Sequence, residues 1–125
     1  MLKEIRDVRQ NPGEGFRRWF RDDRFDLIVF YPSREMEEIK GFQLCYGKEN
    51  GERVLTWLKS RGYRHNKVDD GEIPYRNKMS PILVKDGIFD PDSVLGEFRE
   101  AAAEVDAEIT EVVESRIRNL QFVLE

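Results

Sequence analysis

An Asn-Gly pair between two apolar segments constrains the fold of this chain more than any other sequence feature. Residues 39–46 lead through Lys48-Glu49-Asn50-Gly51 into residues 53–58. Asn-Gly between alternating apolar runs is the strongest short-range signal of a β-hairpin. We therefore expect two antiparallel strands here. A helix over residues 52–60, ending at Gly62, is the alternative that composition leaves open, and we favour the strand.

The hairpin also predicts which side chains share a face. A two-residue loop and a four-residue loop give the same side-chain parity along the two strands. The face expected to meet the core holds Phe42, Leu44, Tyr46, Leu55 and Trp57. The opposite face is expected to hold Cys45, Val54, Thr56 and Leu58.

Other short apolar segments predict further strands. Residues 25–31 are nearly all apolar and end at Pro32-Ser33, which is typical of a central strand covered on both faces. A strand over residues 63–68 would follow the hairpin. The remaining expectations before the C-terminal region are an acidic turn at residues 69–72, a basic loop at 74–79, a buried strand at 82–84 and a turn at Asp86-Gly87.

Two helices are expected in the N-terminal region. Leu2, Ile5 and Val8 recur every three residues, which indicates a short amphipathic helix ending at Asn11-Pro12. The same Asn-Pro pair has the form of a helix start, so a second helix is predicted over residues 13–21. Its core face would carry Phe16, Trp19 and Phe20.

The C-terminal third predicts one long amphipathic helix that begins at Asp90-Pro91. Apolar residues follow the 3.6-residue period from Val94 to Leu120, and a separate acidic stripe holds Glu97, Glu100, Glu104, Glu108 and Glu111. A continuous helix over residues 92–121 would be about 45 Å long at 1.5 Å per residue. It would exceed the roughly 36 Å diameter of a compact chain of this size, so it must overhang, bend or break.

Together these elements predict an α+β fold in a single domain over residues 1–125. We expect a four- to five-stranded antiparallel, meander-like sheet, with the N-terminal helices and one long C-terminal helix packed on a face. The short connections favour antiparallel neighbours, because parallel strands require crossovers of a dozen residues or more.

Composition and motifs argue against several functional classes. The chain contains neither a secretory apolar region nor a run of about 20 apolar residues, so we expect a cytoplasmic protein without a membrane partner. One Cys and one His cannot build a disulfide scaffold or the usual zinc sites. Asp69-Asp70-Gly71-Glu72 lacks the spacing of a calcium loop, and Gly13 and Gly15 lack a dinucleotide fingerprint. No cofactor is expected.

An enzyme hypothesis would use Cys45 as nucleophile and His65 as base, with Asp69 or Asp70 orienting the imidazole. Cys45 lies mid-strand between Leu44 and Tyr46, where a small buried side chain fits equally well. We favour the structural interpretation of Cys45 and a surface strand position for His65.

A second hypothesis is nucleic-acid or anionic-ligand binding through residues 59–78. The basic side chains concerned are Lys59, Arg61, Arg64, Lys67, Arg76 and Lys78. Trp57, Tyr63 and Tyr75 interleave with them and could stack on bases. Net charge is −1 over residues 1–52, +5 over 53–85 and −8 over 86–125, so the cations could instead pair with the acidic final helix. The overall pI near 5.2 also argues against nucleic acid.

The preferred hypothesis is a non-catalytic protein that self-associates or binds a partner. The chain ends in an apolar segment whose side chains would gain about 1.5 to 3 kcal/mol each on burial. Candidate interface residues are Ile117, Leu120, Phe122, Val123 and Leu124. We expect this end to dock as a helix or an edge strand, with a homodimer contact.

Four segments, GFQLCYG, RVLTW, VDDGE and PILVKDGIFD, resemble those of a family of small bacterial proteins with no assigned function. The similarity spans residues 19–94. The resemblance implies a bacterial, stand-alone cytoplasmic protein, and it carries over no catalytic or binding residue.

Overall fold

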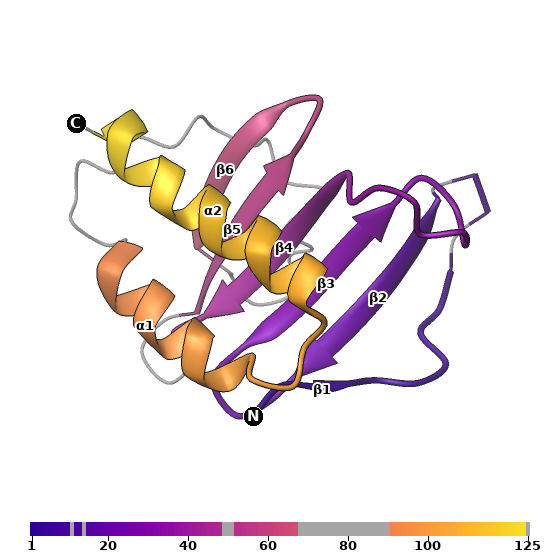
Figure 1. Ribbon diagram of the computed structural model, residues 1–125, viewed down its shortest axis with the longest axis horizontal. Helices are drawn as coiled ribbons and strands as arrows, with labels where there is room; N and C mark the ends of the chain where they lie inside the picture. Colours follow the sequence, from indigo (N-terminus) through magenta and orange to yellow (C-terminus); the bar gives the residue numbers. More distant parts are fainter. Residues whose placement is uncertain (11, 14, 49–51, 68–90, 125) are drawn as a thin grey trace.

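The computed structural model describes residues 1–10, 12–13, 15–48, 52–67 and 91–124, with the backbone alone for residues 66, 67, 91 and 121–124. These residues form an α+β fold (Figure 1). The strands are β1 (Lys3–Glu4), β2 (Phe16–Arg21), β3 (Asp26–Tyr31), β4 (Gly41–Tyr46), β5 (Arg53–Leu58) and β6 (Gly62–Lys67). The helices are α1 (Pro91–Ala101) and α2 (Ala107–Leu124).

The six strands form one antiparallel meander, because each strand pairs with its neighbours in sequence order. This confirms the antiparallel meander, although the described residues alone supply six strands instead of the four or five expected. In the β4–β5 hairpin Phe42 pairs with Trp57, and Leu44 pairs with Leu55. The predicted side-chain parity is therefore correct, and the helical alternative for residues 52–60 is wrong.

β2 replaces the helix expected over residues 13–21. Gly13 and Gly15 have φ values of +82° and +78°, which no α-helix contains. A Cβ atom on Gly15 would lie 2.3 Å from the carbonyl oxygen of Tyr31, so only glycine lets the chain approach β3 this closely. The ladder from Phe16–Tyr31 to Arg21–Asp26 then extends over the whole of β2. Tertiary strand pairing thus overrides the local signal of a helix start.

The N-terminal segment is also extended where a helix was expected over residues 2–8. β1 pairs with the outer edge of β2. The backbone N–H of Leu2 donates to the carbonyl of Ala101 at 2.8 Å, which satisfies one of the unpaired carbonyls at the end of α1. A helix of two turns is marginal in water, whereas the edge of β2 offers backbone partners.

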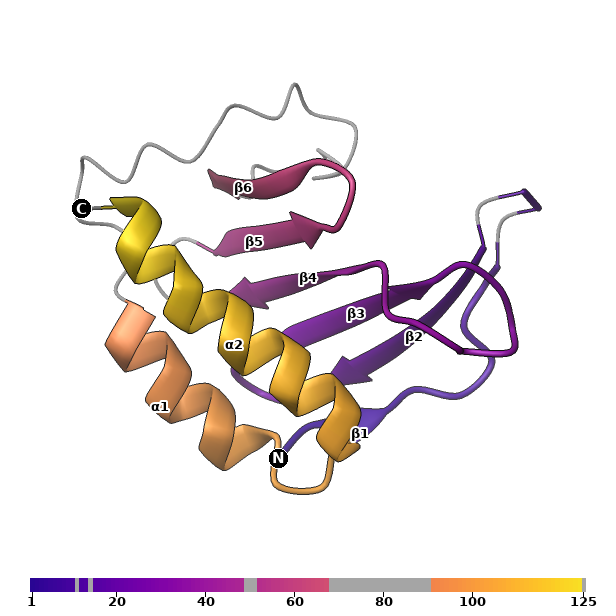
Figure 2. The same ribbon diagram turned by 45° about the horizontal axis from the view of Figure 1, so that its top comes forward.

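The C-terminal apolar period is carried by two helices instead of one. Residues 102–106 connect α1 to α2, and both helices lie on the same face of the sheet (Figures 1 and 2). Asp106 caps α2, because its carbonyl accepts the N–H groups of Ile109 and Thr110. The break lets the whole apolar face of the helical segment meet the sheet, where a continuous helix would exceed the width of the fold.

The core lies between this helix pair and the sheet. Phe25 and Phe98 meet edge to face with ring centroids 6.1 Å apart. On β3, Leu27 and Val29 face the helices and are fully buried, whereas Ile28 on the other face is half-buried. Within the described residues no helix lies over that other face. The helices therefore supply the expected cover on one face of β3, and the described residues do not test the cover expected on the other face.

Several expectations fall on residues that the structure does not describe. These are the end of the strand at Val68, the turn at residues 69–72, the loop at 74–79, the strand at 82–84 and the turn at Asp86-Gly87.

Candidate anion-binding cleft

The structure separates the two residues of the enzyme hypothesis. Cys45 pairs with Val54, and His65 pairs with the next residue, Leu55. Successive residues of a strand point to opposite faces, so Cys45 and His65 lie on opposite sides of the sheet. His65 is half-buried on the helix side, where its Nε2 atom hydrogen-bonds the hydroxyl of Tyr46. Asp69 and Asp70 lie outside the described residues.

Within the described residues, the surroundings of Cys45 favour the thiol over the thiolate. It is half-buried in the middle of the sheet, and burial, followed by the charges of Glu52 and Asp26, raises the pKa of its thiol to about 12. Reactive cysteines instead have thiolates that nearby cations or a helix N-terminus stabilise. The arrangement supports a structural role for Cys45.

The basic segment and its aromatic residues do not share one face. Lys59 and Arg61 lie exposed at the β5–β6 turn, and Arg64 projects from the face opposite to Tyr63. The Tyr63 hydroxyl donates to the carbonyl of Arg116 on α2 at 2.9 Å, and Trp57 is buried in the core. Neither ring is placed to stack on a base. The side chain of Lys67, and Arg76 and Lys78 entirely, lie outside what the structure describes.

Two of the candidate interface residues belong to the core of the chain itself. Ile117 and Leu120 are fully buried against the sheet and α1. Phe122, Val123 and Leu124 lie within α2, so this segment is helical and not an edge strand. Their side chains are not described, and the homodimer contact stays a prediction.

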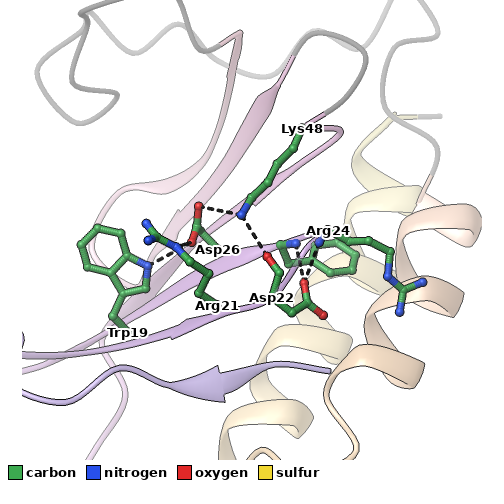
Figure 3. Close-up of polar contacts among 7 residues, drawn as sticks. Trp19, Arg21, Asp22, Arg24, Asp26 and Lys48 are labelled. Carbon is green, nitrogen blue, oxygen red and sulfur yellow. Dashed lines mark hydrogen bonds and ion pairs between the residues drawn. The ribbon is translucent and has the colours of Figure 1, made fainter.

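A carboxylate-centred cluster joins the β2–β3 turn to the end of β4 (Figure 3). The Oδ1 atom of Asp26 lies 2.6 Å from Nε of Arg21 and 3.3 Å from Nε1 of Trp19. Its Oδ2 atom lies 3.2 Å from Nζ of Lys48, which also donates to the carbonyl of Asp22 at 3.1 Å. Three N–H donors, two of them cationic, compensate the charge of the Asp26 carboxylate. This arrangement suits a structural role better than that of a general base.

A cleft of about 690 Å³ opens between residues 5–10, the first half of β2 and the loop after β3. Four arginines contribute to its lining, two carboxylates accompany them, and the apolar part of the wall is small. The lining residues are Glu4, Ile5, Arg6, Asp7, Val8, Gln10, Phe16, Arg17, Arg18 and Arg34.

The cleft exists because residues 5–10 bulge away from the edge of β2. Ile5 donates its N–H to the carbonyl of Trp19 at 2.8 Å. Further along, the side-chain amide of Gln10 bonds both the N–H and the carbonyl of Arg17, at 3.0 and 2.9 Å, as a neighbouring strand would. Between these two contacts the N-terminal segment advances by five residues, from Ile5 to Gln10, whereas β2 covers only two, from Trp19 to Arg17. Asp7 bends the bulge outward with a left-handed backbone, φ 56°.

The arginines of the cleft fall into two classes. Arg18 is paired: its Nε and Nη2 atoms bond Glu4 at 2.9 and 2.7 Å, and its Nη1 atom bonds Asp106 at 3.0 Å. The hydrogen bond to Glu4 outweighs the opposing effect of burial, so the pKa of Arg18 is raised above its ordinary value. Among the described residues no ion pair joins Arg6, Arg17 or Arg34 to a carboxylate.

The sequence patterns did not predict the cleft, because the helix expected over residues 13–21 would have placed Arg17 and Arg18 in solvent. Basic and acidic side chains are also nearly equal in number over residues 1–52, so net charge gave no sign of a basic site there. A strand assignment would have put Arg17 and Arg18 on opposite faces at one edge of the sheet. No local signal places Arg34 beside them, because that contact depends on the β3–β4 loop.

Comparisons of the chain with protein-family models, curated proteins and solved structures found no match. The resemblance drawn from the four segments therefore stays a prediction. Within the described ranges, no group of three or more His, Cys, Asp and Glu side chains is placed to hold a metal ion. No helix in that same part of the chain is long and apolar enough to cross a bilayer.

Proposed function

We propose that this protein is a non-catalytic binding protein whose cleft takes a small anionic ligand bearing a carboxylate or phosphate group. One observation carries the proposal: Arg6, Arg17 and Arg34 line one cleft without a carboxylate ion pair among the described residues. Guanidinium groups bind such oxyanions through paired N–H donors, which is why arginine predominates at sites of this kind.

The dimensions and walls of the cleft fit a small molecule. Ligand sites commonly enclose about 300 to 1,000 Å³, a range that includes this cleft. Phe16 supplies an aromatic wall, and the guanidinium carbon of Arg34 lies 5.7 Å from the centre of its ring. An anion with an apolar body would therefore use both parts of the lining. The separation of Cys45 from His65 supports binding without catalysis.

The deciding experiment is an NMR titration of the isotope-labelled full chain, at low salt, with inorganic phosphate and with benzoate. We expect saturable shifts of the amides in residues 5–10 and 16–18. Arg6→Ala and Arg34→Ala should each weaken binding about tenfold, the order of magnitude of one charge-assisted hydrogen bond. Neither side chain makes a hydrogen bond or ion pair within the described residues, so the fold should survive both changes.

Arg118→Ala is the matched control, because it removes the same charge from an exposed position on α2 outside the cleft. An equal loss of affinity in this control would mean that net charge, and not the cleft, attracts the anion. The absence of saturable shifts with either anion would contradict the proposed function.

A further inference from the structure

Arg18 is the anchored guanidinium of the cleft. Its side chain is 15% exposed, and its guanidinium carbon lies 5.1 Å from the centre of the Phe20 ring. Glu4 meets its Nε–Nη2 edge with both carboxylate oxygens, which is the side-on, two-bond geometry in which arginine binds a free carboxylate.

The two carboxylates that hold Arg18 are far more exposed than Arg18 itself. The Glu4 side chain is 44% exposed and that of Asp106 is 61% exposed. At such exposed positions water solvates a released carboxylate well, so the carboxylate of Glu4 can leave Arg18 without becoming a buried unpaired charge. Glu4 belongs to the two-residue strand β1, so its side chain can turn into solvent while Arg18 stays against Phe20.

We propose that Glu4 occupies the place of a ligand carboxylate, and that a monocarboxylate with an apolar body displaces it from the Nε–Nη2 edge of Arg18. This inference rests on the proposed anion-binding function and names its ligand class. Arg18 is then the residue that binds the carboxylate, and Glu4 is an intramolecular competitor that lowers the affinity.

Charge favours a monocarboxylate over a phosphate dianion at this position. Asp106 remains on the Nη1 atom of Arg18 and repels a second negative charge. A monocarboxylate replaces the single negative charge of Glu4 on Arg18 with an equal charge. A phosphate dianion would add one further negative charge beside Asp106.

The test compares benzoate with inorganic phosphate in NMR titrations of the full chain and of Glu4→Gln, which keeps the shape of the side chain and removes its charge. We expect benzoate to bind Glu4→Gln about tenfold more tightly than the unmodified protein, because the competing charge is gone. A glutamine side chain could still hydrogen-bond the Arg18 guanidinium. Glu4→Ala is therefore a second variant, which removes this contact and should likewise bind benzoate more tightly. Glu108→Gln is the control, since it removes an exposed carboxylate that does not contact Arg18.

The outcomes separate this inference from the function on which it depends. Equal or weaker benzoate binding by both Glu4 variants overturns the competition, while binding by the unmodified chain leaves the proposed function intact. Tighter binding of phosphate than of benzoate overturns the ligand class. If neither anion binds the unmodified chain or the Glu4 variants, the proposed function fails together with the inference.

Discussion

The guanidinium carbon of Arg116 lies 4.2 Å from the centre of the Trp57 ring and thereby joins α2 to β5. Arg116→Ala should remove this cation–π contact and destabilise the fold by about 0.5 to 2 kcal/mol. The indole would gain contact with water, so its fluorescence should shift to the red. Denaturant unfolding followed by tryptophan fluorescence measures both effects. Arg118→Ala, which changes an exposed residue two positions further along α2, should change neither.

The Asp22 carboxyl group should make the stability of the folded protein depend on pH in acidic solution. Burial raises the pKa of its carboxyl, but backbone hydrogen bonds from Phe25 and Arg24, at 2.7 and 2.8 Å, and the nearby terminal amine outweigh burial and lower the pKa. A lowered folded-state pKa gives stability that is complete above the ordinary aspartate pKa of about 3.9 and is lost as pH falls through the folded value.

Asp22→Asn should therefore lower the thermal midpoint at pH 7 and flatten its decline as pH falls below the ordinary aspartate pKa of about 3.9. Thermal unfolding followed by circular dichroism at several pH values tests this. Asp23→Asn changes the exposed neighbouring residue and serves as the control. Identical pH profiles for the two variants would show that the Asp22 carboxylate is not the group responsible.

Thr56→Val should leave stability unchanged or raise it by up to about 1 kcal/mol. The Thr56 side chain is buried, and its hydroxyl oxygen has no hydrogen-bond partner among the residues that the structure describes. Valine has nearly the same shape and contains no polar atom to desolvate. Thr56→Ser keeps the hydroxyl and loses a methyl group, so it should be the less stable variant. Denaturant midpoints decide the order, and a clear loss in Thr56→Val would reveal a partner for the hydroxyl.

Cys45 should react slowly with Ellman's reagent in the native protein. With a thiol pKa of about 12, roughly one molecule in ten thousand carries the thiolate at pH 8. The reaction rate should rise to that of a free thiol only when denaturant unfolds the chain. Complete modification of folded protein within seconds would contradict the structural role and revive the nucleophile.

The C-terminal residues provide the test of self-association. We expect light scattering at several concentrations to detect a dimer of the intact chain and a monomer of a chain ending at Arg118. Leu120→Ala is the control, because it reproduces the loss of one fully buried core side chain, about 2 to 5 kcal/mol, without removing residues 121–125. An intact chain that is monomeric at every concentration would end the homodimer hypothesis.

The elements whose signals are local can be predicted from the order of the amino acids. Asn50-Gly51 and the alternation around it predicted the β4–β5 hairpin, including the side-chain parity that puts Phe42 opposite Trp57. The 3.6-residue apolar period predicted the core face of the C-terminal helices, from Val94 to Leu120. These patterns follow from hairpin geometry and from helix periodicity, which act within short stretches of chain.

The N-terminal strands, the helix break and the cleft depend instead on contacts between distant parts of the chain. Residues 16–21 carry apolar side chains at helical spacing, yet pairing with β3 satisfies their backbone along a full ladder. Residues 102–106 contain neither glycine nor proline, so no local signal predicts the helix break after Ala101. The break follows from the width of the sheet that both helices cover. Arg18 meets Asp106 across 88 positions of sequence, and Arg34 reaches the same cleft from another loop. Contacts at such separations depend on how the strands are ordered, which no short stretch of sequence encodes.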